Sequence, residues 1–239
     1  YSLLDRYLLN VAVRRDGSSR FGKENKWGTF PSAAFAWRVN QENFLKDVSW
    51  IDNLKLRVSY GIVGNQNGIG NYTTLGLADN KGYEFGDTFQ MGYLPGKELS
   101  NPNLKWETNL NFNVGIDFSL FNNRFSGSFD FFTRRSKDLL YSRPIAPSLG
   151  YGSIDENVGA LKNTGIEMVL NGTIINQNGW VWKLGMNLTH YKNKVTDLPL
   201  KDMPRSGVNK LQVGRSVYDF YMIEWAGVDP ENGDPLWYM

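Results

Sequence analysis

The sequence predicts an all-β protein whose antiparallel strands form part of a transmembrane β-barrel. The segment 106–118 alternates apolar and polar residues along its whole length. It is longer than the usual strand of about five or six residues and long enough for the roughly 9–11 residues that cross a membrane. Long and short links also alternate between the predicted strands. Apolar residues make up 41% of the chain without any run near the roughly 18 residues of a membrane helix, so only a closed barrel would span lipid.

Composition excludes several other classes of protein. The net charge is +2 and no dense Lys/Arg run is present, which argues against a nucleic-acid partner. The chain has no cysteine, so disulfides, thiol catalysis and Cys-based metal sites are excluded. Aromatic residues reach 14%, and they favour strands and the membrane–water boundary.

The first part of the chain predicts three strands. Residues 7–14 alternate and lead into a polar loop at 16–22. A second strand is predicted over 30–39. The segment 40–50 follows, with Asn40 as the expected cap of a short helix. A third strand is predicted over 54–62.

The remainder predicts two hairpins separated by irregular segments. The order is an irregular segment 63–105, a strand 106–118, a tight turn 120–124, a strand 125–134, an irregular segment 136–159, a strand 166–174, a turn 176–179 and a strand 180–189. Asn-rich turns suit the left-handed backbone that tight connections need. Residues 192–239 read mostly as loop, with one further strand near 218–228.

The order of the links indicates which ends of the strands lie together. In an antiparallel meander, alternate links emerge at the same end, so the long loops collect at one end and the tight turns at the other. Outer-membrane barrels show this asymmetry, with long loops outside and short turns in the periplasm. Aromatic residues near the predicted strand ends fit a girdle: Tyr7, Trp37, Tyr60, Trp106, Trp180 and Trp182. A soluble β-sandwich or barrel, with the apolar face turned inward, remains an alternative.

Several stretches of the chain match a known sequence pattern. They are YLLNVAVRRDGSSRFG at 7–22, WGTFPS at 27–32, WR at 37–38, LKLRVSYG at 54–61, GNQ at 64–66, GIGNY at 68–72, NPNLKWET at 101–108, GIDF at 115–118, NTGIE at 163–167 and GVDPENGDP at 227–235. Together they resemble one family, the SusC/RagA-type TonB-linked outer-membrane proteins of Bacteroidetes. They occur in family order across nearly the whole chain, which makes the resemblance far more specific than a single motif.

The resemblance implies a barrel of about 22 strands with a plugged lumen, of which this chain would supply about seven or eight. It also implies energy from a TonB system, a SusD-like surface lipoprotein that lids the barrel, and a place in the bacterial outer membrane lipid. The cargo would be an oligosaccharide, or a peptide in some members. We expect residues 1–239 to be barrel wall only, with the signal peptide, the TonB-contacting segment, the plug and the terminal strand absent.

The candidate binding residues follow from the barrel interpretation. The polar faces of the strands would line the lumen, and aromatic residues in the long loops would stack on sugar rings or pack against the lipoprotein. Loop folding also accounts for these aromatic residues. The lumen candidates are Arg14, Arg38, Lys55, Arg57, Glu107, Asn109, Asn111, Asn113 and Asp117, and the loop candidates are Trp27, Tyr72, Tyr83, Phe85 and Tyr93.

No catalytic, cofactor or metal site is predicted. His190 is the one histidine that a catalytic triad would need, and no motif surrounds it. The acidic segment 229–234 resembles a calcium loop only superficially, because it lacks EF-hand spacing, and it reads better as a turn. Gly61, Gly64, Gly68 and Gly70 do not fit a phosphate-binding motif.

The sequence therefore favours a gated importer over two rivals. The first rival is a passive porin or an adhesin-like barrel, which would lack a plug and a TonB-contacting segment. The second is a soluble carbohydrate-binding β-sandwich, with or without hydrolase activity. A glycosidase would need two suitably spaced carboxylates, and their separation does not follow from the sequence.

Overall fold

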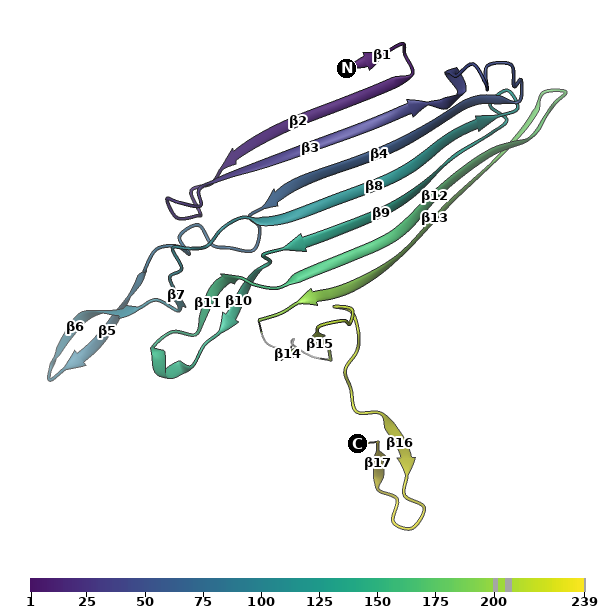
Figure 1. The fold of residues 1–239 in the computed structure, drawn as a ribbon. Helices are drawn as coiled ribbons and strands as arrows, with labels where there is room; N and C mark the ends of the chain where they lie inside the picture. Colours follow the sequence, from purple (N-terminus) through teal and green to yellow (C-terminus); the bar gives the residue numbers. More distant parts are fainter. Residues whose placement is uncertain (200–201, 205–207, 239) are drawn as a thin grey trace.

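A computed structural model describes residues 1–199, 202–204 and 208–238. Its main element is one eight-stranded antiparallel sheet (Figure 1). In spatial order the strands are β1 (Ser2–Leu3), β2 (Tyr7–Gly17), β3 (Trp27–Arg38), β4 (Ile51–Asn65), β8 (Glu107–Leu120), β9 (Phe125–Lys137), β12 (Ala160–Gln177) and β13 (Trp180–Asp197). The spatial order follows the chain order, which makes the sheet a meander. The predicted all-β architecture is confirmed.

The strands are as long as membrane-crossing strands must be. The strands β2, β3, β4, β8 and β9 contain 11, 12, 15, 14 and 13 residues, and β12 and β13 contain 18 each. A tilted strand needs about 9–11 residues to cross the hydrocarbon layer. Every long strand of the sheet reaches this length.

The pairing register brings the apolar residues of all seven long strands onto one face. Val58 pairs with Val114, Val114 with Phe131, and Phe131 with Ile166. The row also extends through Phe35 to Leu9 at the other side. Because side chains opposite each other in a sheet point to the same side, these rows form a continuous apolar band.

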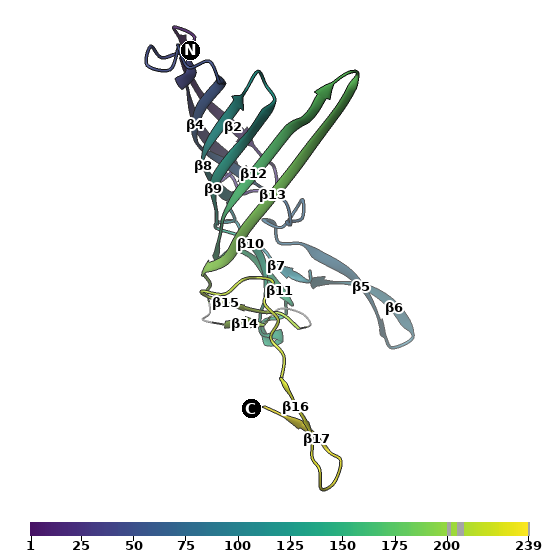
Figure 2. The same ribbon diagram turned by 90° about the vertical axis from the view of Figure 1, so that its right-hand side faces the viewer.

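The apolar band is exposed rather than packed against a second layer. Val114, Phe131 and Leu188 keep 41%, 40% and 48% of their surface accessible. Figure 2 shows the large sheet as one layer of strands, and the smaller sheets lie at its loop end. Such a face on a sandwich would be buried, so the band fits contact with lipid.

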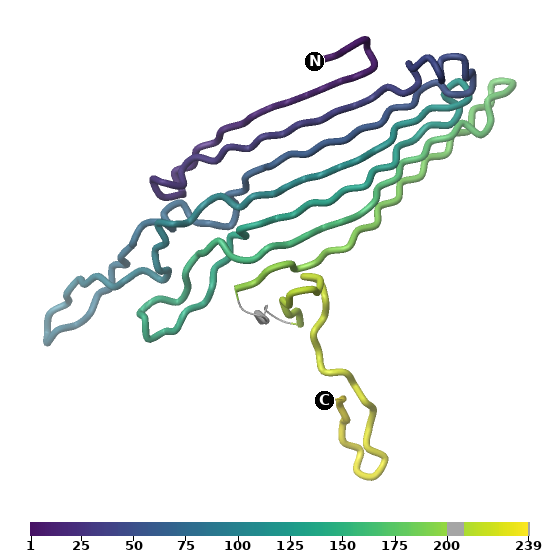
Figure 3. The backbone as a smooth tube through the Cα atoms, viewed as in Figure 1, coloured from purple at the N-terminus to yellow at the C-terminus, as the bar shows by residue number. Residues whose placement is uncertain are grey.

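The two ends of the sheet differ in the way that the link lengths predict. The tight turns and the long loops lie at opposite ends of the strands, as the backbone trace shows (Figure 3). Asn122 and Asn123 have φ values of 56° and 59°, and Asn178 and Gly179 have 50° and 82°. Both predicted turns, 120–124 and 176–179, are therefore confirmed with the left-handed backbone expected of them.

The short helix expected after Asn40 does not form. The segment contains one 3-10 turn, η1 (Val39–Gln41), followed by hydrogen-bonded turns. Asn40 caps no helix, because its side-chain amide donates to the carbonyl of Asp52. Instead Glu42 accepts hydrogen bonds from the Tyr7 hydroxyl at 2.6 Å and the Trp37 indole at 3.0 Å. These donors hold the pKa of Glu42 below its usual value and fix two aromatic side chains at this end.

The long loops contain more regular structure than the sequence indicated. The segment 63–105 was expected to be irregular, but β4 continues to Asn65 and a hairpin follows. Likewise, β9 runs to Lys137 and a second hairpin interrupts 136–159. The elements in these loops are β5 (Ala78–Phe85), β6 (Thr88–Pro95), β7 (Glu98–Leu99), β10 (Leu140–Pro144), η2 (Pro147–Leu149) and β11 (Ser153–Asn157). Strand β11 also pairs with β7 in parallel, which joins the two loops.

The C-terminal region departs from its prediction in two places. Strand β13 extends to Asp197, past the expected end at 189, because its pairing with β12 continues. The strand expected near 218–228 is shorter, β16 (Trp225–Val228), and pairs with β17 (Pro235–Trp237). The short strands β14 (Asp202–Pro204) and β15 (Lys210–Gln212) precede it. The loop prediction for 192–239 also covers 200–201, 205–207 and 239, which lie outside the described residues.

A small hydrophobic core ties the loops to the sheet. It is formed by Phe21, Ile69 and Leu104, with Trp106 packed against it. The Trp106 ring lies 5.0 Å from the Phe21 ring and 5.6 Å from the Phe30 ring. Trp106 was expected in the aromatic girdle, but β8 begins one residue later and the ring serves this core instead.

The assignment of the two faces of β8 can be tested with a matched pair of substitutions. We expect Val114→Lys to lower the free energy of unfolding of the full-length protein in lipid vesicles by about 2–4 kcal/mol, because it places a charge in the middle of the apolar band. Asn113→Lys, one residue away on the polar face, should change it far less. Equal losses for the two variants in a denaturant titration would contradict the assignment of the faces.

Candidate functional site

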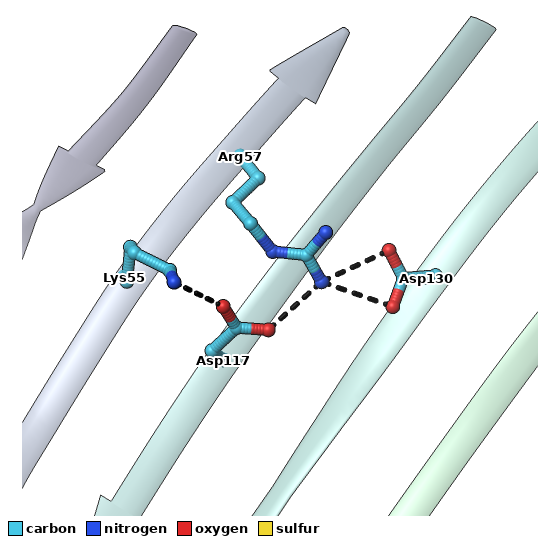
Figure 4. Close-up of polar contacts among 4 residues, drawn as sticks. All are labelled: Lys55, Arg57, Asp117 and Asp130. Atoms are coloured by element: carbon cyan, nitrogen blue, oxygen red, sulfur yellow. Dashed lines mark hydrogen bonds and ion pairs between the residues drawn. The ribbon is translucent and has the colours of Figure 1, made fainter. Parts of the chain in front are cut away.

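The polar face of the sheet holds a four-residue charge cluster that spans three strands. Lys55 and Arg57 come from β4, Asp117 from β8 and Asp130 from β9 (Figure 4). Asp117 accepts from Lys55 Nζ at 2.7 Å and from Arg57 Nη2 at 2.8 Å. The same Nη2 lies 3.1 Å from both carboxylate oxygens of Asp130. The cluster has two positive and two negative charges, so it is electrically balanced.

A glycine makes this cluster possible. Gly115 lies directly between Arg57 and Asp130 in the pairing register. A Cβ atom at this position would lie 2.3 Å from Asp130 Oδ1 and 2.8 Å from Arg57 Nη2. Any larger residue on β8 would therefore separate the two side chains. The missing side chain lets Arg57 reach across one strand to the next.

Closer to the long loops, Glu107 joins three segments of the chain. Its Oε1 accepts from the side-chain amides of Asn65 at 3.1 Å and Asn109 at 3.2 Å, and its Oε2 accepts from the backbone of Leu140 at 3.4 Å. Asn109 also accepts from the Ser136 hydroxyl. This network holds the first residues of β8 against β4, β9 and the loop that follows β9.

The predicted lumen residues fall into separate groups. The pairing register puts all of them on the polar face, and it brings Lys55, Arg57 and Asp117 together. Asn111 joins the Glu107 network through a 3.4 Å bond to the carbonyl of Asn109. Arg14 and Arg38 lie near opposite ends of the sheet and pair with Asp16 and Asp5, respectively.

Asp130 completes the cluster although the sequence did not single it out. It follows the alternation of β9, so its face was predictable. Its role depends on which strand lies on the far side of β8, and no local pattern gives that information. A glycine between two charged rows was the available signal.

The aromatic candidates are exposed, and they lie on different elements. Trp27 begins β3, and the Arg15 guanidinium lies 5.3 Å from its ring. Tyr83 and Tyr93 belong to the β5–β6 hairpin, with Phe85 at its tip. Tyr72 lies in the loop before that hairpin.

A polar cleft beside Tyr72 was not predicted. It is lined by residues from the β2–β3 loop and from the β4–β5 loop, and its volume is about 740 Å³. Arg20 and Lys23 are its charged lining residues, and Gln66 and Asn71 add amides. The cleft is therefore cationic and has one aromatic wall.

The remaining candidates have structural explanations. His190 pairs with Ile166 on the apolar face of β13. The acidic segment after β16 forms a turn, in which Asp229 Oδ1 accepts from the backbone of Glu231 and Asn232 Oδ1 accepts from the backbone of Asp234. Among the described residues, no group of His, Asp or Glu side chains is arranged to hold a metal ion.

Comparison with known proteins gives one consistent answer. Residues 1–234 match the family model described as TonB dependent receptor-like, beta-barrel. The TonB-dependent receptor SusC of Bacteroides thetaiotaomicron is 39% identical over 256 aligned residues, which cover 99% of this chain and 25% of that protein. The TonB-dependent receptor P3 of Formosa agariphila is 36% identical over 95% of this chain and 24% of its own length.

Solved structures agree with the sequence matches. The RagAB peptide transporter aligns with a TM-score of 0.87 and 32% identity, over 98% of this chain and 26% of that one. The RagAB peptide importer in its closed-closed state gives a TM-score of 0.88, also at 32% identity, over 98% of this chain and 25% of that one. The chain thus spans about a quarter of the length of the proteins that it matches.

The role of Gly115 can be tested by adding one methyl group. We expect Gly115→Ala to lower the unfolding free energy of the full-length protein by about 1–3 kcal/mol, because the methyl overpacks the space between Arg57 and Asp130. Gly172→Ala is the control, since its Cβ would meet its nearest atoms at 3.6 Å. The idea fails if the two alanine variants unfold at the same denaturant concentration.

Proposed function

This chain belongs to the TonB-dependent receptor-like β-barrel family, as a SusC/RagA-like barrel region in the bacterial outer membrane, and on this basis we propose that the full-length protein imports a nutrient by a TonB-dependent mechanism. The family is one of receptors and transporters rather than enzymes. The observation that supports import most directly is the two-sided wall, with an exposed apolar band on one face and the charged Arg57 cluster on the other.

We propose that the polar face lines a lumen that a plug fills in the complete barrel. Arg57 has donors to spare, since its Nε is buried without a partner among the described residues. Plug groups or cargo that accept hydrogen bonds would satisfy it. Glu107, Asn109 and Asn111 are already bonded to one another or to neighbouring strands, so they chiefly fix the wall.

The proposed cargo is an oligosaccharide or a peptide. RagAB is described as a peptide transporter, which suggests the peptide class. The oligosaccharide class is what the resemblance of the sequence to the SusC/RagA-type family implies. The cleft lined by Arg20, Lys23 and Tyr72 lies among the long loops and offers cations, amides and an aromatic ring. An aromatic face suits sugar rings and apolar side chains, and the two cations suit a carboxylate.

A SusD-like lipoprotein is the proposed partner at the long-loop end. The β5–β6 hairpin projects from the sheet (Figure 1), and its large apolar side chains are exposed on both faces. A two-stranded hairpin is marginally stable alone in water. Exposed Tyr83 and Tyr93, at 53% and 76% of their surface, are suited to burial against a protein lid.

Energy coupling separates the importer from a passive porin. We expect uptake of a fluorescent oligosaccharide or peptide to be lost when the parent gene is deleted and also when TonB is deleted, because a plugged barrel does not conduct until it is opened. Restoring the full-length gene should restore uptake only in cells with TonB. Uptake that persists without TonB would favour the porin.

The proposed lid contact has its own test. We expect Tyr93→Ala, combined with Tyr83→Ala, to weaken binding of the lipoprotein to the purified full-length receptor by about tenfold or more, as loss of interface aromatics commonly does. Phe44→Ala is the control, because Phe44 is also exposed, at 68%, but lies at the tight-turn end. Unchanged affinity in the double variant, measured by surface plasmon resonance, would exclude the hairpin as a contact.

A further inference from the structure

Three cations lie side by side on the lipid-facing side of the sheet. In the strand register, Arg135 on β9 lies opposite Lys162 on β12, and Lys162 lies opposite Lys194 on β13. Neighbouring strands are about 4.8 Å apart, so the row spans roughly 10 Å. All three residues are exposed. This basic row, defined as Arg135, Lys162 and Lys194, lies at the long-loop ends of its strands.

The basic row borders the apolar band. Four residues closer to the tight turns, the same strands contribute the row Phe131, Ile166 and His190. Thr133, Thr164 and Lys192 form the row between the two, and the two threonine hydroxyls are 3.3 Å apart. Cations and hydroxyls therefore begin where the apolar surface ends, at the level of lipid headgroups.

The charges of the basic row are not balanced by nearby carboxylates. Across the described residues, none of its three side chains forms an ion pair. The next row outward contains Lys137, Ala160 and Asp197, so one lysine accompanies one carboxylate there. Asp138 also lies close in sequence, but it pairs with Lys105 at 3.0 Å.

Two carboxylates of the paired strands β9 and β12 lie on the other face. Asp130 and Glu167 pair with each other in the register on the polar side, where Asp130 contacts Arg57. Like charges directly opposite each other destabilise a sheet. Three adjacent cations without an acidic neighbour in their row therefore repel one another and destabilise the sheet. Binding of an external anion would offset this repulsion.

We propose that the basic row binds the phosphate group of a lipid in the outer leaflet of the outer membrane. The inference rests on the proposed function for its orientation, since long loops face the outside of an outer-membrane barrel. Arg and Lys are the usual partners of phosphate. The side of the sheet decides the source of that phosphate, because the row faces lipid and not the lumen.

Lipid binding to the purified full-length receptor in mild detergent tests the proposal. Native mass spectrometry would compare lipid A that has one phosphate with the same lipid A after removal of the phosphate. We expect the phosphorylated form to bind at least about tenfold more tightly, as clustered cations at a membrane surface favour anionic headgroups. The triple variant Arg135→Gln, Lys162→Gln, Lys194→Gln should lose this preference, and Lys162→Gln alone should lose part of it.

Two further variants control for charge and fold. Arg134→Gln with Lys183→Gln removes cations from β9 and β13 on the polar face, and it should keep the preference. Lys162→Arg with Lys194→Arg keeps the charge of the row and should also keep it. Equal binding of the two lipids to the unaltered receptor, or an unchanged preference in the triple variant, would overturn the proposal.

Free phosphate is distinguished in the same assay. Inorganic phosphate at millimolar concentration should not displace the phosphorylated lipid, and complete displacement would overturn the assignment to lipid. No cargo, lipoprotein or TonB is present in these measurements. A failure of lipid binding is therefore separable from a failure of the import proposal, which uptake in cells tests.

Discussion

Unbroken antiparallel pairing is the constraint on which the rest of this structure depends. In hydrocarbon, each backbone N–H and C=O must find its partner within the protein, and here each long strand from β3 to β12 is paired on both sides. The register that satisfies the backbone also decides the side chains, because a shift of one residue would exchange the two faces of a strand. Val58, Val114 and Phe131 share one row for this reason, and Arg57, Gly115 and Asp130 share a row on the opposite face.

The side chains of the polar face are subject to an electrostatic requirement that those of the apolar face are not. Lipid accepts any apolar side chain, whereas neighbouring charges must be matched in sign and in reach. The structure meets this requirement by leaving space: Gly115 allows a guanidinium to contact a carboxylate two strands away. Because these side chains are partly exposed, the strength of each ion pair is reduced by solvent. Their more definite effect is geometric, since β4, β8 and β9 are joined at one level of the wall.

The local alternation of apolar and polar residues predicted the strands and their faces. Each feature that it failed to predict has an identifiable physical cause. Residues 106–118 revealed both faces of β8, because each position follows the two-residue period. The β5–β6 hairpin was missed since Gly82 and Gly92 interrupt that period, while Phe89 and Tyr83 fold over the bare backbone. Asn40 resembled a helix cap, but Glu42 is held by Tyr7 and Trp37 from other strands. Likewise, the partnership of Arg57 with Asp130 depends on the order of strands, which no single segment encodes.

The distribution of outward charge and the lengths of the loops both distinguish the two ends of the wall, and they do so independently. At the tight-turn end, the outward side chains are aromatic, as at Tyr7, Trp37 and Trp182. At the long-loop end, they include Arg15, beside Trp27, and the basic row. Loop length is set by the connections and outward charge by residues within the strands, so neither dictates the other. Their agreement means that the strands themselves distinguish the two surfaces of a membrane, one with aromatic rings and the other with cations suited to phosphate.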